Sequence, residues 1–277
     1  MATCNLSRTA FAAALGVSLG LIGAAAWAGD AAAAANETGD TIPAGPLGDA
    51  VNRGRDLLTR TRVLLPAYVG SRLNCTSCHI DGGRRPSALP WTGVLADYPQ
   101  YRPREARVLT IEDRVNECFK RSLNGKSLPA DGEGMRDIVS YFAWLSRGTP
   151  IGRAKTKESG FLSARPADKK AGAVLYAQRC VRCHGADGAG LTGPDDDPDG
   201  EIPPLWGPQS FNVAAGMARQ RTAEAFIRSS MPQGAEATLT EQQARDVAAF
   251  VINQPHPDFA AKAADWPKGG KPDDARY

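Results

Sequence analysis

The stretches "CTSCH" (residues 75–79) and "CVRCH" (residues 180–184) decide the fold of this 277-residue chain. In the pattern C-x-x-C-H, two thiols add to the vinyl groups of a haem and the adjacent histidine holds the iron from one side. A zinc site would need further cysteine or histidine at ligand spacing, and none follows either stretch. The chain is therefore expected to bind two covalent haems c. Their attachment residues would be Cys75, Cys78, His79, Cys180, Cys183 and His184.

The flanks of the two motifs repeat, which indicates a tandem duplication. His184 follows His79 by 105 residues (184 − 79), and Arg245 of "RDV" follows Arg136 of "RDI" by 109 (245 − 136). Each motif follows one helical pattern, and another closes each half. Helix, haem motif, proline-containing loop and two further helices is the order of a class I cytochrome c domain. We therefore expect an all-α fold of two tandem class I cytochrome c-like domains, each binding one covalent haem c.

A loop after each motif places proline before tryptophan: "SALPWTGV" follows the first and "EIPPLWGPQSFN" the second. A proline carbonyl there could accept a hydrogen bond from the free ring nitrogen of the haem-binding histidine, which orients the imidazole. Trp91 and Trp206 are expected to pack in the haem cavities. The acidic run "DDDPDGE" (residues 195–201) is expected to be a solvated loop.

The chain opens with an export signal. Arg8 precedes an Ala/Gly-rich apolar run that ends in a small-x-small triplet, which is typical of a secretory signal peptide. An uncleaved membrane anchor is the alternative. Covalent haem attachment happens outside the cytoplasm, so both features indicate a bacterial periplasm, with no membrane span after signal cleavage. The expected organisation is a signal peptide (1–28), a flexible segment (29–46), cytochrome c domain 1 (47–147), a linker (148–168), cytochrome c domain 2 (169–254) and a C-terminal tail (255–277).

The charge balance excludes one class of partner. Without Arg8, 32 basic residues face 30 acidic ones, which gives no footprint for nucleic acid.

Each iron needs a sixth ligand or an open position, and the chain has only three histidines. His256 remains after the two motifs, but it sits between prolines in the tail, where we expect a surface residue. Met231 precedes Pro232, which turns the chain and leaves the thioether free to ligate the second iron. Met217 lies in a helical stretch and is expected to pack in the core or the haem wall.

In the first domain, a distal ligand is sought in the stretch "TIEDRVNECFKRSLNG" (residues 110–125). Thr110 and Asp113 resemble a capping box, and Asn124-Gly125 is a helix stop signal. The stretch is therefore expected to be a helix.

On that helix Arg114, Cys118 and Ser122 follow at i, i+4 and i+8 and share one face. Cys118 would be either a buried small hydrophobe or an iron ligand of thiolate type. Once Cys4 leaves with the signal peptide, five cysteines remain, so Cys118 has no partner cysteine, and the domain offers no better distal ligand. Both points favour the iron.

Several stretches resemble the diheme thiosulfate dehydrogenases over most of residues 45 to 255: "PWTGV", "YPQYRPR", "TIEDRVNECFKRSLNG" and "PPLWGPQSFNVAAGM". The specific part is the block R-x-x-x-C-x-x-R-S-x-N-G, because C-x-x-C-H alone names no function. The resemblance implies an active-site haem in the first domain and an electron-transfer haem in the second. The iron ligands that it implies are His79, Cys118, His184 and Met231, and the residues that line the substrate pocket are Arg104, Arg114, Cys118 and Ser122.

Members of this family couple two thiosulfates to tetrathionate, and some run the reverse reaction. Thiosulfate is a dianion, so coupling two of them needs guanidinium groups such as Arg104 and Arg114 to offset the repulsion. The resemblance also implies an external electron acceptor, such as a small cytochrome c or a high-potential iron–sulfur protein. Some members carry lysine where this chain has Ser230. Ligand exchange by that route is therefore not expected here, and a constant His/Met haem is.

Two other functions stay open. A diheme electron-transfer cytochrome without its own substrate needs neither a polar pocket nor a cysteine, so the face of Arg114, Cys118 and Ser122 argues against it. A SoxA-like subunit also uses a cysteine-ligated haem but conjugates thiosulfate to a carrier protein. A diheme peroxidase would want a labile histidine site, and the chain has no histidine to spare.

Overall fold

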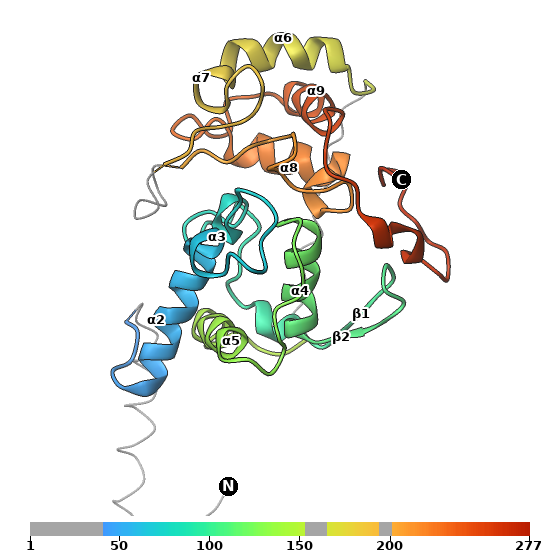
Figure 1. The fold of residues 1–277 in the computed structure, drawn as a ribbon. Helices are drawn as coiled ribbons and strands as arrows, with labels where there is room; N and C mark the ends of the chain where they lie inside the picture. Colours follow the sequence, from blue (N-terminus) through green and yellow to red (C-terminus); the bar gives the residue numbers. More distant parts are fainter. Residues whose placement is uncertain (1–40, 153–164, 194–200) are drawn as a thin grey trace, which may run out of the picture. The chain divides into compact units, whose positions relative to one another are not determined.

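The computed structural model describes residues 41–152, 165–193 and 201–277 (Figure 1). The expected signal peptide, most of the expected linker and all but the last residue of the acidic run lie outside the described residues. Among the helices of the described ranges, none is long and apolar enough to cross a membrane.

The first domain is built on two crossing helices, α2 (Pro46–Thr59) and α5 (Glu133–Leu145). They approach most closely at Gly54, where a Cβ atom would lie 2.0 Å from the carbonyl oxygen of Asp137. Only glycine allows the two backbones to touch in this way. The neighbouring Arg53 donates two hydrogen bonds of 2.8 Å to the Asp137 carboxylate, which holds the crossing in place.

The second domain repeats this crossing with α6 (Lys169–Arg179) and α9 (Glu241–Ile252). A Cβ atom on Gly172 would lie 2.0 Å from the carbonyl oxygen of Asp246. Arg165 donates to the Asp246 carboxylate at 2.7 Å. The same combination of glycine, aspartate and arginine thus sits at the helix crossing of each domain, as a duplication predicts.

The elements between these pairs carry the functional residues. A 3₁₀ turn (Cys75–Ser77) opens the first haem motif and α7 (Val181–His184) carries the second. A short antiparallel hairpin in the first domain and an isolated antiparallel bridge between Leu191 and Ile202 depart from an all-α chain. The remaining helices and strands are α3 (Thr61–Leu64), β1 (Gln100–Arg102), β2 (Arg107–Leu109), α4 (Ile111–Arg121) and α8 (Gln220–Ser230). Further 3₁₀ turns lie at Val94–Asp97, Gly216–Ala218 and Ala260–Ala264.

Helix α4 begins and ends as its sequence predicts. The Thr110 hydroxyl accepts a hydrogen bond from the Asp113 backbone at 3.3 Å, and the Asp113 carboxylate accepts one from the Thr110 backbone at 3.1 Å. At the other end, the backbone N–H of Ser122 donates to the Cys118 carbonyl at 2.8 Å. Asn124 then adopts a left-handed conformation (φ 49°), which stops the helix.

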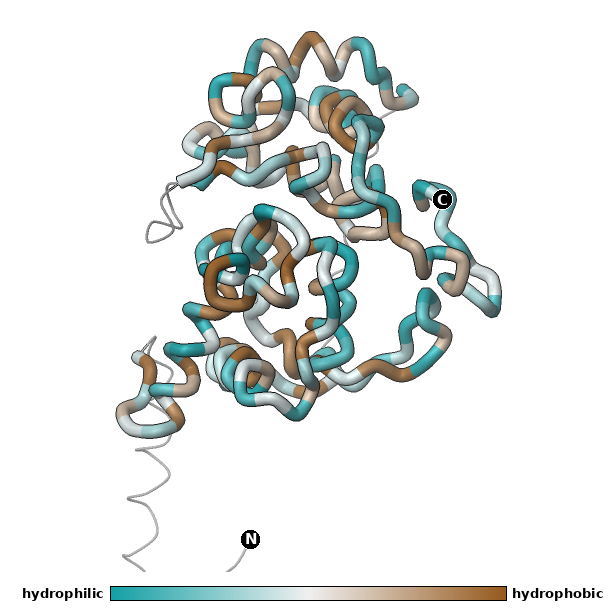
Figure 2. Tube along the Cα trace, viewed as in Figure 1, coloured by the Kyte–Doolittle hydropathy of each residue, from teal (hydrophilic) through white to brown (hydrophobic). Residues whose placement is uncertain are grey.

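The core of the first domain lies between these helices. Phe119 of α4 and Met135 and Ile138 of α5 are fully buried there. Met135 is thus a core residue. Figure 2 shows that hydrophobic residues recur along the helices, whereas the segment leading to the C-terminus is mostly hydrophilic.

Candidate haem centres and active site

The first haem-motif histidine is held from two sides. Its Nδ1 atom lies 2.5 Å from the carbonyl oxygen of Leu89, and its ring stacks on Trp91 with centroids 4.6 Å apart. The acceptor is thus the residue before Pro90, not the proline that we expected. Burial lowers the pKa of His79 to about 4. The imidazole is therefore neutral, which is the form that binds metal.

The second haem-motif histidine follows the expected pattern. His184 Nδ1 lies 3.2 Å from the carbonyl oxygen of Pro203, and burial lowers the pKa of this histidine as well. A tyrosine hydroxyl steadies the chain near each motif, because Tyr141 donates to Gly82 and Tyr176 to Gly185, both at 2.8 Å. The backbone around both histidines is thereby fixed.

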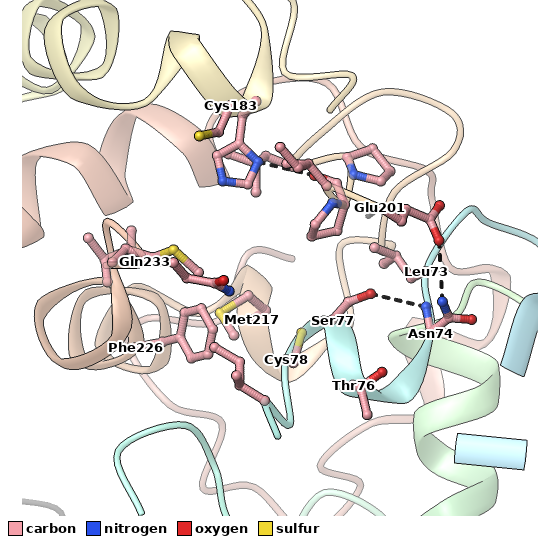
Figure 3. A pocket seen from close by; sticks show the side chains of 18 of the residues that line it. Leu73, Asn74, Thr76, Ser77, Cys78, Cys183, Glu201, Met217, Phe226 and Gln233 are labelled. Atoms are coloured by element: carbon pink, nitrogen blue, oxygen red, sulfur yellow. Dashed lines mark hydrogen bonds between the residues drawn. The ribbon is translucent and has the colours of Figure 1, made fainter. Parts of the chain in front are cut away.

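A cavity of about 670 Å³ adjoins both haem motifs. Cys78 of the first motif and all three attachment residues of the second line it, and so does Met231. In Figure 3, Cys78 and Cys183 lie on opposite sides of the open space, and Met217 points into it. Thiols, an imidazole and a thioether within a largely apolar wall fit haem c. The apolar lining includes Leu205, Phe211, Phe226, Ile227, Leu239, Val247 and Val251.

Arg114 and Cys118 gather beside the first motif. The electrostatic interaction with Cys118 is the largest cause of the raised pKa of Arg114. Burial raises the pKa of the Cys75 and Cys78 thiols to about 12, and Cys118 contributes to both shifts. Tyr98 also belongs to this group. Its pKa is raised, chiefly by burial; the Arg114 guanidinium opposes this shift and Cys118 adds to it. Tyr98 was not among the residues expected at the site, although it is the first residue of the block "YPQYRPR".

The other two candidate pocket residues are placed differently. Ser122 caps α4 one turn after Cys118, as the helical spacing predicts. Arg104 donates to the Ala214 carbonyl at 2.9 Å, and its guanidinium lies 4.8 Å from the ring centroid of Trp266 in the C-terminal tail. Among the residues that the structure describes, these contacts of Arg104 do not include Cys118. Its role in substrate binding stays a prediction.

Glu201, expected in a solvated loop, has a buried side chain. Its side chain is 5% exposed, and its Oε2 atom accepts hydrogen bonds from Arg62 Nε at 3.0 Å and Asn74 Nδ2 at 3.3 Å. Glu201 also lines the cavity, where Figure 3 shows it joined to Asn74 just ahead of the first motif. The solvated-loop prediction is wrong for this residue, because Arg62 lies 139 positions away and no local pattern reveals such a partner.

His256 and Met217 also differ from expectation. His256 is half-buried rather than on the surface: it stacks on Phe211 at 4.5 Å, and its ring nitrogens lie 3.1 and 3.3 Å from the carbonyl oxygens of Phe211 and Val251. Burial lowers the pKa of His256, so the neutral ring has a single N–H and donates to one of these two carbonyls. Met217 packs against the core and lines the cavity, as expected, but from a 3₁₀ turn (Gly216–Ala218) that precedes α8 rather than from a continuous helix.

Two family profiles match the sequence. The profile described as "SoxA/TsdA, cytochrome c domain" matches residues 70–151, and "Cytochrome c" matches residues 169–255. The chain is therefore a c-type cytochrome with two cytochrome c domains, and it binds haem c. This confirms the expected fold class.

Comparison with curated relatives defines the family. The chain is 43% identical over 232 residues to a thiosulfate dehydrogenase of Allochromatium vinosum, which covers 81% of this chain and 84% of the relative. It is 41% identical over 239 residues to a thiosulfate dehydrogenase of Psychrobacter arcticus, which covers 85% of this chain and 72% of the relative. The chain belongs to the thiosulfate dehydrogenase family and is an oxidoreductase of cytochrome c type.

A solved structure agrees with this placement. The thiosulfate dehydrogenase TsdBA from Marichromatium purpuratum, in its as-isolated form, matches with a TM-score of 0.71 and 36% identity over 80% of this chain. This chain spans 50% of that longer chain. A SoxA subunit of L-cysteine S-thiosulfotransferase from Pseudaminobacter salicylatoxidans is 30% identical, but over only 78 residues, or 28% of this chain.

Proposed function

We propose that this protein is a periplasmic diheme enzyme that couples two thiosulfates to tetrathionate, with the reverse reaction open to it. The observation that carries the proposal is the position of Arg114 and Cys118, one turn apart on α4 and close to the first haem motif. A guanidinium and a thiolate at this place suit a small sulfur-containing anion. Membership of the thiosulfate dehydrogenase family supports the same reading.

Two covalent haems c, one on each motif, would each accept one of the two electrons that the reaction releases. His79 and Cys118 would hold the first iron, and His184 and Met231 the second. The neutral imidazole of His79 suits its role. Met231 lines the same cavity as His184, which suits the proposed role of both residues as ligands of the second iron.

Arg114 would offset the charge of the substrates. Two thiosulfate dianions repel each other and a nearby thiolate, so a fixed guanidinium lowers the cost of bringing them together. The raised pKa of Arg114 keeps it charged throughout the working pH range. Arg104 and Ser122 would complete the substrate pocket.

Cys118 would act as the sulfur-bearing residue. Its thiolate joins the sulfane sulfur of one thiosulfate in a new S–S bond, and two electrons leave. The second thiosulfate attacks that sulfane sulfur, forms the S–S bond of tetrathionate and releases the Cys118 thiolate. In the alternative mechanism, thiosulfate would displace Cys118 from the iron and would form no bond with the cysteine sulfur.

Electrons would pass from the first domain to the second and then to an external acceptor. The cavity that adjoins both haem motifs supports a short route between the domains. A small cytochrome c or a high-potential iron–sulfur protein would be a suitable acceptor.

The test is the Cys118→Gly variant, assayed for thiosulfate-dependent reduction of an artificial acceptor. We expect both haems to stay attached, as seen by haem staining and mass, while turnover collapses. Glu112→Gly places the same helix-weakening residue elsewhere on α4 and should retain turnover. Undiminished turnover in Cys118→Gly would contradict the catalytic role.

The same assay separates the alternatives. A wild-type protein that forms no tetrathionate but exchanges electrons with another cytochrome would be an electron carrier. One that transfers thiosulfate to a carrier protein would be a SoxA-like subunit.

A further inference from the structure

We infer that Asp265 and Trp266 of the C-terminal tail are positioning residues for the substrate pocket: they hold α4 and Arg104 in place from outside. The inference rests on the proposed function and goes beyond it, because it assigns a role to a segment outside both cytochrome domains. Neither residue is within the haem motifs or the proposed pocket.

The first contact joins the tail to α4. Arg121 donates two hydrogen bonds to the Asp265 carboxylate, from Nη1 at 2.7 Å and from Nη2 at 2.8 Å. Both side chains are buried, at 7% and 5% exposed. A bidentate pair of this kind fixes the angle between its partners as well as their distance. The tail residue Phe259 adds its ring, whose centroid lies 4.5 Å from the Arg121 guanidinium.

The position of Arg121 on α4 connects the tail to Cys118. Arg121 also donates to Glu117 at 2.6 Å, so these two residues form a stripe along the helix. Cys118 lies in the adjacent stripe, one residue after Glu117. A helix is stiff over one or two turns, so a tether on one stripe fixes the rotation of the other. Asp265 thereby sets where the Cys118 thiolate points.

The second contact joins the tail to Arg104. The backbone N–H of Trp266 donates to the Arg104 carbonyl at 2.8 Å, and the Arg104 guanidinium stacks over the Trp266 ring. Trp266 is 8% exposed. Asp265 thus holds α4, which carries Arg114, and Trp266 holds the segment that carries Arg104.

The tail is itself anchored to the second domain. The Asp274 carboxylate accepts hydrogen bonds from Arg219 Nε at 2.9 Å and from the Arg221 backbone at 3.1 Å, at the start of α8. The tail is therefore a fixed strap between the domains, and its hold on α4 does not depend on the first domain alone.

The experiment uses the full-length protein with its haems attached. Asp265→Asn keeps the size of the side chain and removes its charge. We expect the KM for thiosulfate to rise between about tenfold and about a hundredfold, the cost of misplacing the arginines that position the substrate by about 1 Å. The ferric low-spin electron paramagnetic resonance signal of a thiolate-bound haem should broaden or shift, while both haems stay attached.

Two further variants keep the test decisive if Asp265→Asn folds poorly. Arg121→Lys retains the charge but not the bidentate geometry, so it should reproduce the spectral change in a milder form. In the double variant, the effects on KM should be less than additive, because both changes break one contact. Additive effects would overturn the inference.

The matched control is Asp273→Asn, in the same tail. Its ion pair with Arg221 is exposed, at 74% and 58%, and touches neither α4 nor Arg104. This variant should leave KM and the spectrum unchanged. A purely structural role for Asp265 would lower the melting temperature without moving either readout.

The outcomes also separate this inference from the proposed function. If Cys118→Gly abolishes turnover while a folded Asp265→Asn keeps its KM and spectrum, the inference fails and the function stands. If the wild-type protein does not oxidise thiosulfate, the function fails, and the resonance signal of Asp265→Asn still decides whether the tail positions Cys118.

Discussion

The hydroxyl of Ser230 donates a hydrogen bond to the backbone carbonyl of Ser87, at 3.0 Å and across the two domains. Ser229 donates to the same carbonyl at 2.8 Å. Ser230 is fully buried. The position before the methionine, where some family members carry lysine, is therefore occupied in this chain by a residue that joins the domains.

This contact links the surroundings of both haem motifs. Ser230 immediately precedes Met231, the proposed ligand of the second iron. Ser87 lies two residues before Leu89, whose carbonyl orients His79. A shift of the chain at Met231 is thus transmitted to the first motif through two hydrogen bonds and a short loop.

We predict that Ser230→Ala destabilises the protein by about 1 kcal/mol, because one hydrogen bond is lost while Ser229 still satisfies the Ser87 carbonyl. Changing both serines to alanine should cost about 1–3 kcal/mol more, because that carbonyl then loses both donors. Denaturant unfolding measures the cost, and the methionine-to-iron absorption band reports on Met231. The exposed Thr238→Ala is the control. A double variant no less stable than the single one would refute the link.

Glu201→Gln should raise the reduction potential of at least one haem. The carboxylate lines the cavity between the motifs, and a buried negative charge favours the oxidised iron. Its removal should shift the potential by tens of millivolts, where about 59 mV corresponds to a tenfold change in a one-electron equilibrium. A redox titration followed by absorbance measures this. The exposed Glu241→Gln should leave both potentials in place, and a fall in potential for Glu201→Gln would contradict the argument.

Gly54→Ala should destabilise the first domain by about 3 kcal/mol or more, because its Cβ would meet the Asp137 carbonyl at 2.0 Å and force α2 away from α5. Gly134→Ala in α5 is the matched control. Its Cβ would find only side-chain carbons at 3.7 Å, so the better helix propensity of alanine should leave stability unchanged or raise it by up to about 1 kcal/mol. Thermal melts of the two variants should therefore move in different directions or by clearly different amounts.

Acid should weaken the structure around α4 and the tail. Burial opposes the ionisation of Glu117, but hydrogen bonds from Lys120 and Arg121 outweigh it and lower the pKa of Glu117 below 4.5. Asp274 behaves alike: burial opposes its charge, and Arg219 overcomes this and lowers its pKa below 3.8. A lowered folded-state pKa stabilises the fold above the unfolded value, and this stability is lost as pH falls through the folded one.

The measurement is denaturant unfolding from about pH 6 down to about pH 3. Stability should fall through the lower part of this range, and Glu117→Gln should flatten the fall. A wild-type stability that rises on acidification would show that the sign of the linkage is wrong.

Local sequence patterns predicted the helices and the haem motifs. The capping box of Thr110 and Asp113 and the stop at Asn124 are fixed by neighbours within four residues, so the sequence shows them directly. The proline rule was right for His184 and off by one residue for His79, because either carbonyl in such a loop can reach the ring. The roles of the pocket residues remain predictions.

Contacts between residues far apart in the sequence could not be predicted. The carboxylate of Glu201 pairs with Arg62 across 139 positions, and that of Asp265 pairs with Arg121 across 144. No residue near Glu201 or Asp265 in the sequence indicates that either carboxylate has a distant arginine partner. Charged residues are by default expected on the surface. The hairpin of β1 and β2 was missed because each strand has only three residues, too few for an alternating pattern.

The long reach of the Arg121–Asp265 pair also sets an order of events during biogenesis. A chain that emerges from its N-terminal end presents α4 well before Asp265, so the first domain can fold and acquire its haem while α4 is still untethered. The tether on α4 therefore forms only after the chain as far as Asp265 has been made.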